Sequence, residues 1–328
     1  RFATDLWLEY ADTPVTTSAY FGMAQTVADQ ANKAKPKETP TALRLQAIHR
    51  LETFRTLYPN HPLADDAALS QINLLLDLED YDNAIHLSQQ GQQIFTDSEF
   101  LSSFQYTQSL AHFAQMNFKQ AIQYAEIIAE GGSEDKNLAQ YILGQIYHAQ
   151  NKPRQAIQWY TQVKSIYPDA GESIDYFEQQ KLKIPEVTII RPNAPKTLDL
   201  TFRNIDRVQL QIYQVDLMKL FLRQKNLSQM SQIRLAGVEP QLTTEIKLNN
   251  PTLYLEHRQQ VQLDLSQIGA YLIICRGDQA SSSTSEFTSG LMLITPLKME
   301  VQPVGDRLRL NVKSAETSDY QPKVHLKA

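Results

Sequence analysis

Apolar side chains recur every three or four residues along the first half of the chain, which is the spacing of one face of an α-helix. The clearest stretch is 137–168. Gly144 and Tyr147 lie three residues apart and share one face of a first helix. Ala156 and Tyr160 lie four residues apart and share one face of a second helix. The pattern predicts a helical hairpin whose two helices pack through these faces.

The dipeptide Ala-Ile recurs in register with this hairpin. It follows a polar break and begins each predicted second helix, and the intervals between its occurrences are 37, 37 and 35 residues. A small side chain at that position lets the two helices approach closely. Because one hairpin cannot bury its apolar face alone, the repetition predicts a stack of hairpins with a continuous core. The four occurrences are Ala47-Ile48, Ala84-Ile85, Ala121-Ile122 and Ala156-Ile157.

These repeats predict a helical domain over 17–182, preceded by a lead-in segment over 1–16. The first hairpin has a long internal loop at 35–41, which contains two prolines. The last helix closes the stack, since a terminal unit must present a polar outer face. The predicted helices are 17–33 and one that contains Ala47, 64–78 and 81–95, 98–115 and 118–130, 136–150 and 153–167, and finally 171–182.

From residue 184 onward the apolar residues alternate or form short runs rich in β-branched and aromatic side chains, which predicts β-strands. We expect an antiparallel β-sandwich of about seven strands over 183–303. The tail, 304–328, predicts the opening hairpin of a further β domain. The predicted strands are 186–191, 197–203, 207–215, 243–248, 259–265 and 270–275, with two more on either side of Pro296, and a short helix at 216–224 and a loop at 280–285 lie between them.

The fold class is therefore α plus β with several domains. An N-terminal α-solenoid of about four helical hairpins precedes the β-sandwich. The chain begins at Arg1 without an initiator methionine and ends on a strand-like alternation. We therefore expect it to be a segment of a longer polypeptide.

Composition limits the kinds of partner. The formal net charge is −5, whereas nucleic-acid-binding surfaces are basic, so no nucleic-acid partner is expected. No apolar run approaches the roughly 18 residues of a membrane-spanning helix, so we expect no transmembrane segment in this sequence. The single cysteine excludes an internal disulfide framework.

No pattern of residues predicts a catalytic, cofactor or metal site. The histidines lack metal-ligand spacing, although His49 and His86 share a helix phase, which leaves a ligand pair as the alternative to a solvated face. Cys275 lies in an apolar strand, where a buried structural cysteine is expected rather than a reactive thiolate. The segment 276–278 spells the integrin-binding tripeptide Arg-Gly-Asp, but a strand that ends in Gly-Asp is also an ordinary turn. We predict that the chain is not an enzyme and holds no cofactor.

The hairpin at 137–168 resembles a tetratricopeptide repeat. It has a small residue and a tyrosine on the first helix, alanine and then tyrosine on the second, and a proline at the end. The leading tryptophan of that family is Gln140 here. The resemblance implies a concave surface that holds a partner protein or peptide. The matching residues are Gly144, Tyr147, Ala156, Tyr160 and Pro168.

We predict that first-helix residues line this concave surface and hold a partner peptide through amide hydrogen bonds. Gln and Asn are frequent on these helices, whereas the basic clamp expected for an acidic C-terminal peptide is missing. The predicted partner-binding residues are Asn73, Gln105, Gln108, Gln140 and Tyr141.

The β region resembles a macroglobulin domain of the bacterial alpha-2-macroglobulin-like proteins, particularly long ones that carry tetratricopeptide repeats before it. The resemblance covers about 100 residues. It implies a large protein of the bacterial periplasm, cell surface or extracellular space, acting as a protease trap or surveillance factor. The Cys-Gly-Glu-Gln thioester of that family has no counterpart at Cys275. The matching residues and short motifs are Arg203-Asn204, Tyr213, Asp216-Leu217, Leu235-Ala236-Gly237, Gly269-Ala270-Tyr271-Leu272, Arg276-Gly277-Asp278 and Ser289-Gly290-Leu291.

The preferred hypothesis is a non-enzymatic binding and scaffold segment that holds a partner on the repeats, with the sandwich as a spacer. A second hypothesis is a structural cell-surface protein that self-assembles through the repeat array. A third is an enzyme whose site forms between the array and the sandwich, which would require perturbed titratable groups in a deep cleft.

Overall fold

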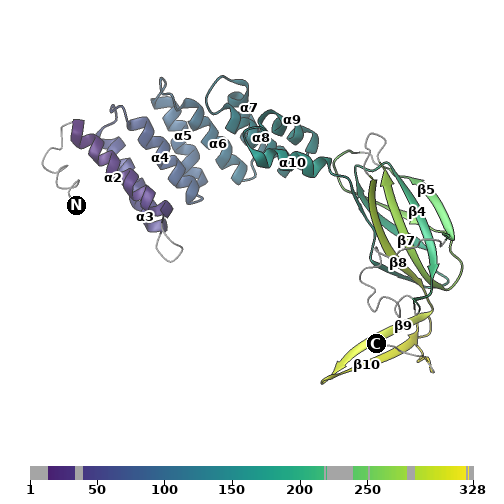
Figure 1. Cartoon of the computed structure of the whole chain (residues 1–328). Helices are drawn as coiled ribbons and strands as arrows, with labels where there is room; N and C mark the ends of the chain where they lie inside the picture. The colour runs from purple at the N-terminus through teal and green to yellow at the C-terminus, as the bar shows by residue number, and fades with distance from the viewer. Residues whose placement is uncertain are drawn as a thin grey trace. The chain divides into compact units, whose positions relative to one another are not determined.

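The computed structural model of the chain describes residues 14–33, 40–217, 219, 239–249, 252–278, 285–322 and 324. Backbone contacts divide the chain into two compact units, Arg1–Asp175 and Tyr176–Ala328. Helices make up the first unit and strands the second, and only the end of the last helix falls beyond the division (Figure 1). The predicted lead-in segment, the helix at 216–224 and the loop at 280–285 lie largely outside the described residues.

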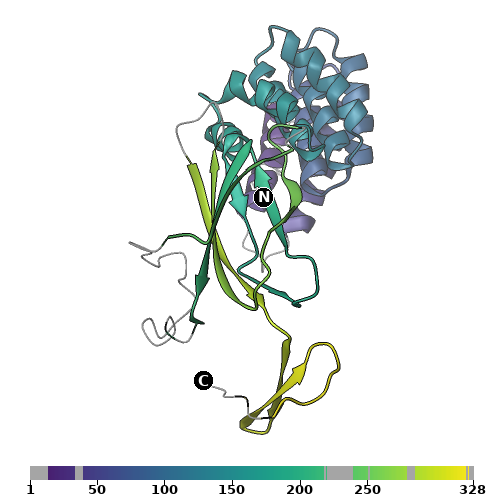
Figure 2. The same cartoon turned by 90° about the vertical axis from the view of Figure 1, so that its right-hand side faces the viewer.

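The described part of the chain contains nine helices; α2 to α9 form four successive antiparallel pairs, and α10 follows them (Figures 1 and 2). Each helix contacts the next along the chain from α2 to α9, so the pairs stack as a solenoid and the predicted fold class is confirmed. The helices are α2 (Pro14–Lys33), α3 (Pro40–Leu57), α4 (Ala64–Asp77), α5 (Tyr81–Ile94), α6 (Leu101–Ala114), α7 (Phe118–Glu130), α8 (Lys136–Ala149), α9 (Pro153–Val163) and α10 (Pro168–Glu178).

Small residues set the distance between the helices of a pair. The four alanines of the Ala-Ile dipeptides are at most 1% exposed. Gly144 of α8 faces Tyr160 of α9 so closely that an added Cβ atom would lie 2.5 Å from the tyrosine ring. No side chain larger than hydrogen fits there without displacing the ring, which explains why the sequence has glycine in that position.

Three helix pairs share one turn geometry. The second residue after the first helix is left-handed in each, with φ of 60° at Glu79, 60° at Met116 and 56° at Asn151. The next backbone N–H donates to the carbonyl five residues earlier, at 2.9, 2.8 and 2.9 Å respectively. A left-handed residue at this position is a common helix terminator, but it is usually Gly or Asn. Only Asn151 therefore signals the turn in the sequence.

Two sheets and a separate hairpin make up the second unit. Among the described strands, the order is β1-β3-β6 in a three-stranded sheet and β2-β8-β7-β4-β5 in a five-stranded sheet, and β9 pairs only with β10. Alternate residues of the central strands, such as Leu200, Leu210 and Ile273, form one apolar core. The strands are β1 (Lys181–Lys183), β2 (Val187–Ile190), β3 (Thr197–Arg203), β4 (Arg207–Val215), β5 (Leu242–Lys247), β6 (His257–Gln262), β7 (Gly269–Asp278), β8 (Ser285–Ile294), β9 (Leu297–Val304) and β10 (Arg307–Ser314).

Two details differ from the sequence-based expectation. The helix predicted over 171–182 ends at Glu178, because Leu182 is buried in the sandwich core and its strand β1 pairs with β3. The sheet is not wholly antiparallel, since the short edge strand β2 runs parallel to β8. Gly290 of β8 permits this arrangement, because a side chain there would collide with the carbonyl oxygen of Pro185 just before β2.

Asn204 ties three segments of the second unit together. It is buried and left-handed, with φ of 55°. Its Nδ2 donates to the carbonyl oxygens of Phe177 (2.7 Å) and Gln179 (3.2 Å), and its Oδ1 accepts from the backbone N–H of Tyr254 (2.8 Å). Asparagine suits this position, because it tolerates the left-handed region and carries both a donor and an acceptor.

The hairpin of β9 and β10 is amphipathic. Met299 faces Val312 and Val301 faces Leu310 on one side, whereas Lys298 and Lys313 pair with Glu300 on the other. Most of its apolar side chains are exposed in the described part of the chain. The predicted boundary at residue 304 falls within this hairpin, which begins at Leu297.

None of the helices in the described ranges combines the length and apolar character needed to cross a membrane.

We predict opposite effects on stability for two glycine-to-alanine substitutions. Gly144→Ala should destabilise the array by about 1–3 kcal/mol, because the added methyl group overlaps the Tyr160 ring. Gly171→Ala in α10 should stabilise it by about 0.5–1 kcal/mol, because no atom beyond its chain neighbours and its own helix backbone lies within 4 Å of the added carbon, and alanine favours the helix. Thermal unfolding followed by circular dichroism measures both. Equal shifts of the two midpoints would contradict the packing argument.

Candidate protein-binding surface of the helical repeats

The first helices of the pairs form one side of the array. α2 contacts α4, α4 contacts α6 and α6 contacts α8, whereas the second helices approach one another less closely. Helices that lie closer together on one side make the stack curve toward that side. We use the term inner face for the surface formed by α4, α6 and α8.

The structure separates the predicted partner-binding residues into two groups. Asn73 on α4 is exposed, and Gln105 on α6 and Tyr141 on α8 are partly exposed. Gln108 and Gln140 are buried, with exposed fractions of 1% and 6%. Side chains covered to this degree do not offer amides to a partner in this conformation.

The buried glutamines take part in helix packing instead. Gln140 donates from Nε2 to Oε1 of Gln162 on α9 at 2.8 Å. Gln108 lies one turn after the buried Phe104 and one turn before the buried Ala111, so its helix phase is that of the core. This phase was readable in the sequence, but the polarity of glutamine suggested a surface position.

Tyr141 belongs to a cluster of aromatic and acidic side chains, which we name the tyrosine surface: Tyr106, Tyr141, Tyr167, Asp135 and Asp169. The ring centroids of Tyr141 and Tyr167 are 4.7 Å apart, and the Tyr141 hydroxyl donates to Oδ2 of Asp169 at 2.8 Å. Asp135 accepts hydrogen bonds from the hydroxyl groups of Ser102 and Ser103, each at 2.7 Å. These bonds hold both carboxylates in place beside the rings.

The pKa values of two phenols of this surface, Tyr106 and Tyr141, are raised. Burial, together with Tyr167, Asp135 and Tyr141 nearby, raises the pKa of Tyr106 to about 12. Burial and the hydrogen bond to Asp169 raise the pKa of Tyr141. The surface therefore combines neutral aromatic rings with two carboxylates and contains no cation of its own.

Sequence reasoning identified one member of the cluster and missed the others. Tyr106 and Tyr141 are 35 residues apart, the same interval as between Ala121 and Ala156, so they occupy the same position in successive repeats. That coincidence was a usable signal. Tyr167 and the two aspartates lie between helices or at a helix start, where periodicity gives no information.

The groups considered for chemistry lie in unreactive settings. Burial raises the pKa of the Cys275 thiol to about 12. His86 accepts from Nε2 of Gln90 at 3.0 Å if that ring nitrogen is unprotonated. Gly277 of the Arg-Gly-Asp tripeptide lies within β7 and packs under Ile205. Among the described residues, no group of three or more His, Cys, Asp or Glu side chains could hold a metal ion.

Comparison with known proteins supports the repeat assignment. Residues 106–171 match the tetratricopeptide repeat family model. Such repeats are protein-interaction modules, so this array has a protein-binding or scaffold role. No curated protein matches the chain.

The solved structures that are similar to this chain have low sequence identities and low TM-scores. Native alpha-2-macroglobulin from Escherichia coli, spanning domains MG0-NIE-MG1, is 19% identical with a TM-score of 0.34 over 44% of this chain. This chain spans about half of that structure, 48% of its length. MamA 41-end from Desulfovibrio magneticus RS-1 is 12% identical with a TM-score of 0.37, over 48% of this chain and 82% of that one.

We predict late ionisation of two tyrosines. Tyr106 and Tyr160 have folded-state pKa values of about 12, above the roughly 10 of an unfolded chain. As the pH rises, these two tyrosines therefore ionise in the unfolded state before they ionise in the folded state. The free energy of unfolding that they contribute is fully present below about pH 10 and is lost as the pH rises toward 12. Phenolate absorbance during an alkaline titration measures the two late steps.

Tyr106→Phe should remove one of these steps and leave the other. A native protein whose tyrosines all ionise together near pH 10 would contradict the assignment.

Proposed function

We propose that this chain is a non-enzymatic binding and scaffold segment of a large bacterial alpha-2-macroglobulin-like protein of the cell envelope or extracellular space. The tetratricopeptide match supports the binding role. The short sequence motifs that resemble macroglobulin domains support the proposed parent family and the envelope or extracellular location of the protein. The sandwich serves as a spacer between the repeats and further domains.

The partner binds at the tyrosine surface in this proposal. Tyrosine is enriched at protein interfaces, because its ring supplies a large contact area and its hydroxyl a hydrogen bond. The ring of Tyr141 on α8 lies against that of Tyr167, which follows α9; Asp169 lies beside Tyr141, and Asp135 lies near Tyr106. The surface thus fits a peptide that places Lys or Arg side chains over the rings and within reach of the carboxylates.

The amide residues that remain accessible extend this surface. Asn73 and Gln105 lie on the neighbouring first helices α4 and α6 and are exposed or partly exposed. They can bind the backbone of an extended peptide that follows the inner face. Gln108 and Gln140 shape the packing beneath it.

We predict that Tyr141→Ala weakens partner binding at least about tenfold, because it removes a central ring and the hydrogen bond to Asp169. The complete chain serves as bait in an envelope extract, a captured protein is identified by mass spectrometry, and its affinity for each variant is measured by calorimetry. Tyr141→Phe keeps the ring and should lose less affinity. Tyr81→Ala, on α5 outside the tyrosine surface, is the matched control and should bind like the wild type.

Two results would oppose this proposal. A partner that binds the Tyr141→Ala variant as tightly as the wild type does not use the tyrosine surface. Capture of the parent protein alone, with a mass in solution that doubles with concentration, would favour self-assembly through the repeats.

A further inference from the structure

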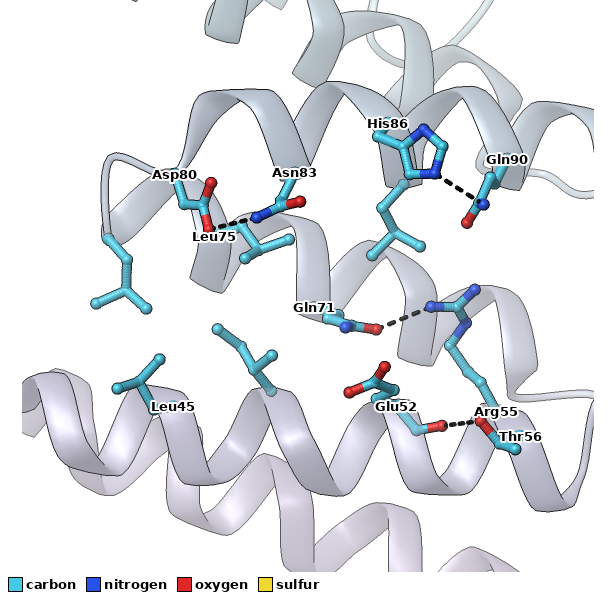
Figure 3. A pocket seen from close by; sticks show the side chains of 13 residues that line it. Leu45, Glu52, Arg55, Thr56, Gln71, Leu75, Asp80, Asn83, His86 and Gln90 are labelled. Carbon is cyan, nitrogen blue, oxygen red and sulfur yellow. Dashed lines mark hydrogen bonds between the residues drawn. The ribbon is translucent and has the colours of Figure 1, made fainter.

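A second surface of the array lies away from the inner face, where α3 and α5 border a groove that has α4 at its base (Figure 3). The groove has a volume of about 550 Å³. Gln71 and Leu75 face it from α4, whereas Asn73 between them points to the other side of that helix. The groove is therefore distinct from the tyrosine surface.

The α3 side of the groove changes from apolar to charged along its length, whereas Asp80 and Asn83 of α5 lie toward the Leu45 end (Figure 3). Leu45, Ile48, Glu52 and Arg55 lie on one face of α3, at steps of three or four residues. The first two are apolar and the last two charged, so the character changes along this side of the groove. Figure 3 shows Leu45 near one end and Arg55 near the other, with Gln71 at the base and His86 and Gln90 across from Arg55.

Arg55 is a partly buried cation at the charged end of the α3 side. Its Nη1 donates to Oε1 of the neutral amide of Gln71 at 2.8 Å, and its buried Nε has no hydrogen-bond partner. No carboxylate forms an ion pair with it in the described part of the chain. Burial lowers the pKa of Arg55 even though Glu52 on the same helix opposes this effect. A partly desolvated cation of this kind gains free energy when a carboxylate joins it.

We propose that this groove binds a partner peptide that carries a carboxylate side chain and, about three residues away, an aliphatic side chain. The carboxylate pairs with the free edge of the Arg55 guanidinium, and the aliphatic group fills the end formed by Leu45 and Ile48. Ile48 and Arg55 are seven residues apart on α3, or about 10 Å, which an extended peptide covers in about three residues.

The charges around Arg55 favour a carboxylate over a phosphate. Arg55 is the one arginine or lysine among the 13 described residues that line the groove, and Glu52 stands beside it. Arg55 carries one positive charge, whereas a phosphate monoester brings nearly two negative charges, and Glu52 repels the phosphate more strongly than it repels a single carboxylate. Asp80, the other acid, lies at the far end and accepts a hydrogen bond from Nδ2 of Asn83 at 2.8 Å.

The test compares two fluorescein-labelled heptapeptide libraries by fluorescence anisotropy with the complete chain. One library fixes Leu and Glu three residues apart, in both orders, and randomises the other positions. The second library has Gln in place of Glu. We expect the Glu library to bind at least about tenfold more tightly, because only the carboxylate pairs with the guanidinium.

Variants identify the residue responsible. Arg55→Gln should bind both libraries equally, at the level of the Gln library, whereas Arg50→Gln, the same change on the same helix outside the groove, should keep the tenfold difference. Circular dichroism melting checks that each variant is folded. The comparison of the two libraries on the wild type does not depend on any variant, so an unstable Arg55→Gln leaves the proposal testable.

Three outcomes would overturn the proposal. They are equal binding of the two libraries to the wild type, no binding of either library, and an unchanged preference in a folded Arg55→Gln variant. A chain whose dimerisation is lost in Arg55→Gln would assign the groove to a second copy instead of a partner peptide.

Discussion

The close approach of paired helices at small side chains is the constraint on which the rest of the array depends. Ala47, Ala84, Ala121 and Ala156 are almost completely buried, each at the crossing of one helix pair. Because the same crossing recurs at intervals of 35 to 37 residues, several other features of the repeat return at the same position. The left-handed turns at Glu79, Met116 and Asn151 and the paired tyrosines of the inner face follow from this regularity.

Polar contacts between neighbouring repeats show a regular separation of their own. Asp65 accepts from Ser98, Asp82 from Gln115 and Asp135 from Ser102, and each pair is 33 residues apart. Asp65 and Asp135 are partly buried and Asp82 is exposed, and one such bond contributes only about 0.5–1.5 kcal/mol. Together, however, the bonds connect each hairpin only to its immediate neighbour, as expected of a solenoid whose stability accumulates from one interface to the next.

The sequence was sufficient for the architecture and insufficient for the surfaces. Small residues at a fixed interval predict the helix pairs, because two helices can pack closely only where a small side chain lies between them. Leu182 was assigned to a helix, because three residues of strand are too short to show a period, and Gln140 was assigned to the surface on polarity alone. The unpaired state of Arg55 depends on which carboxylates lie within reach across three helices, and no linear pattern contains that information.

The hairpin of β9 and β10 affects how any association of this chain is interpreted. One side of it carries exposed Met299, Val301 and Leu308, and a two-stranded ribbon with an open apolar side readily adheres to a second one. Dimers of the isolated chain could therefore form through these strands while the repeats remain unoccupied. A dimer formed through the helices and a dimer formed through the hairpin have the same mass in solution. Self-association can therefore be assigned to the helices only in a variant whose hairpin has been made polar, for example by Val301→Lys.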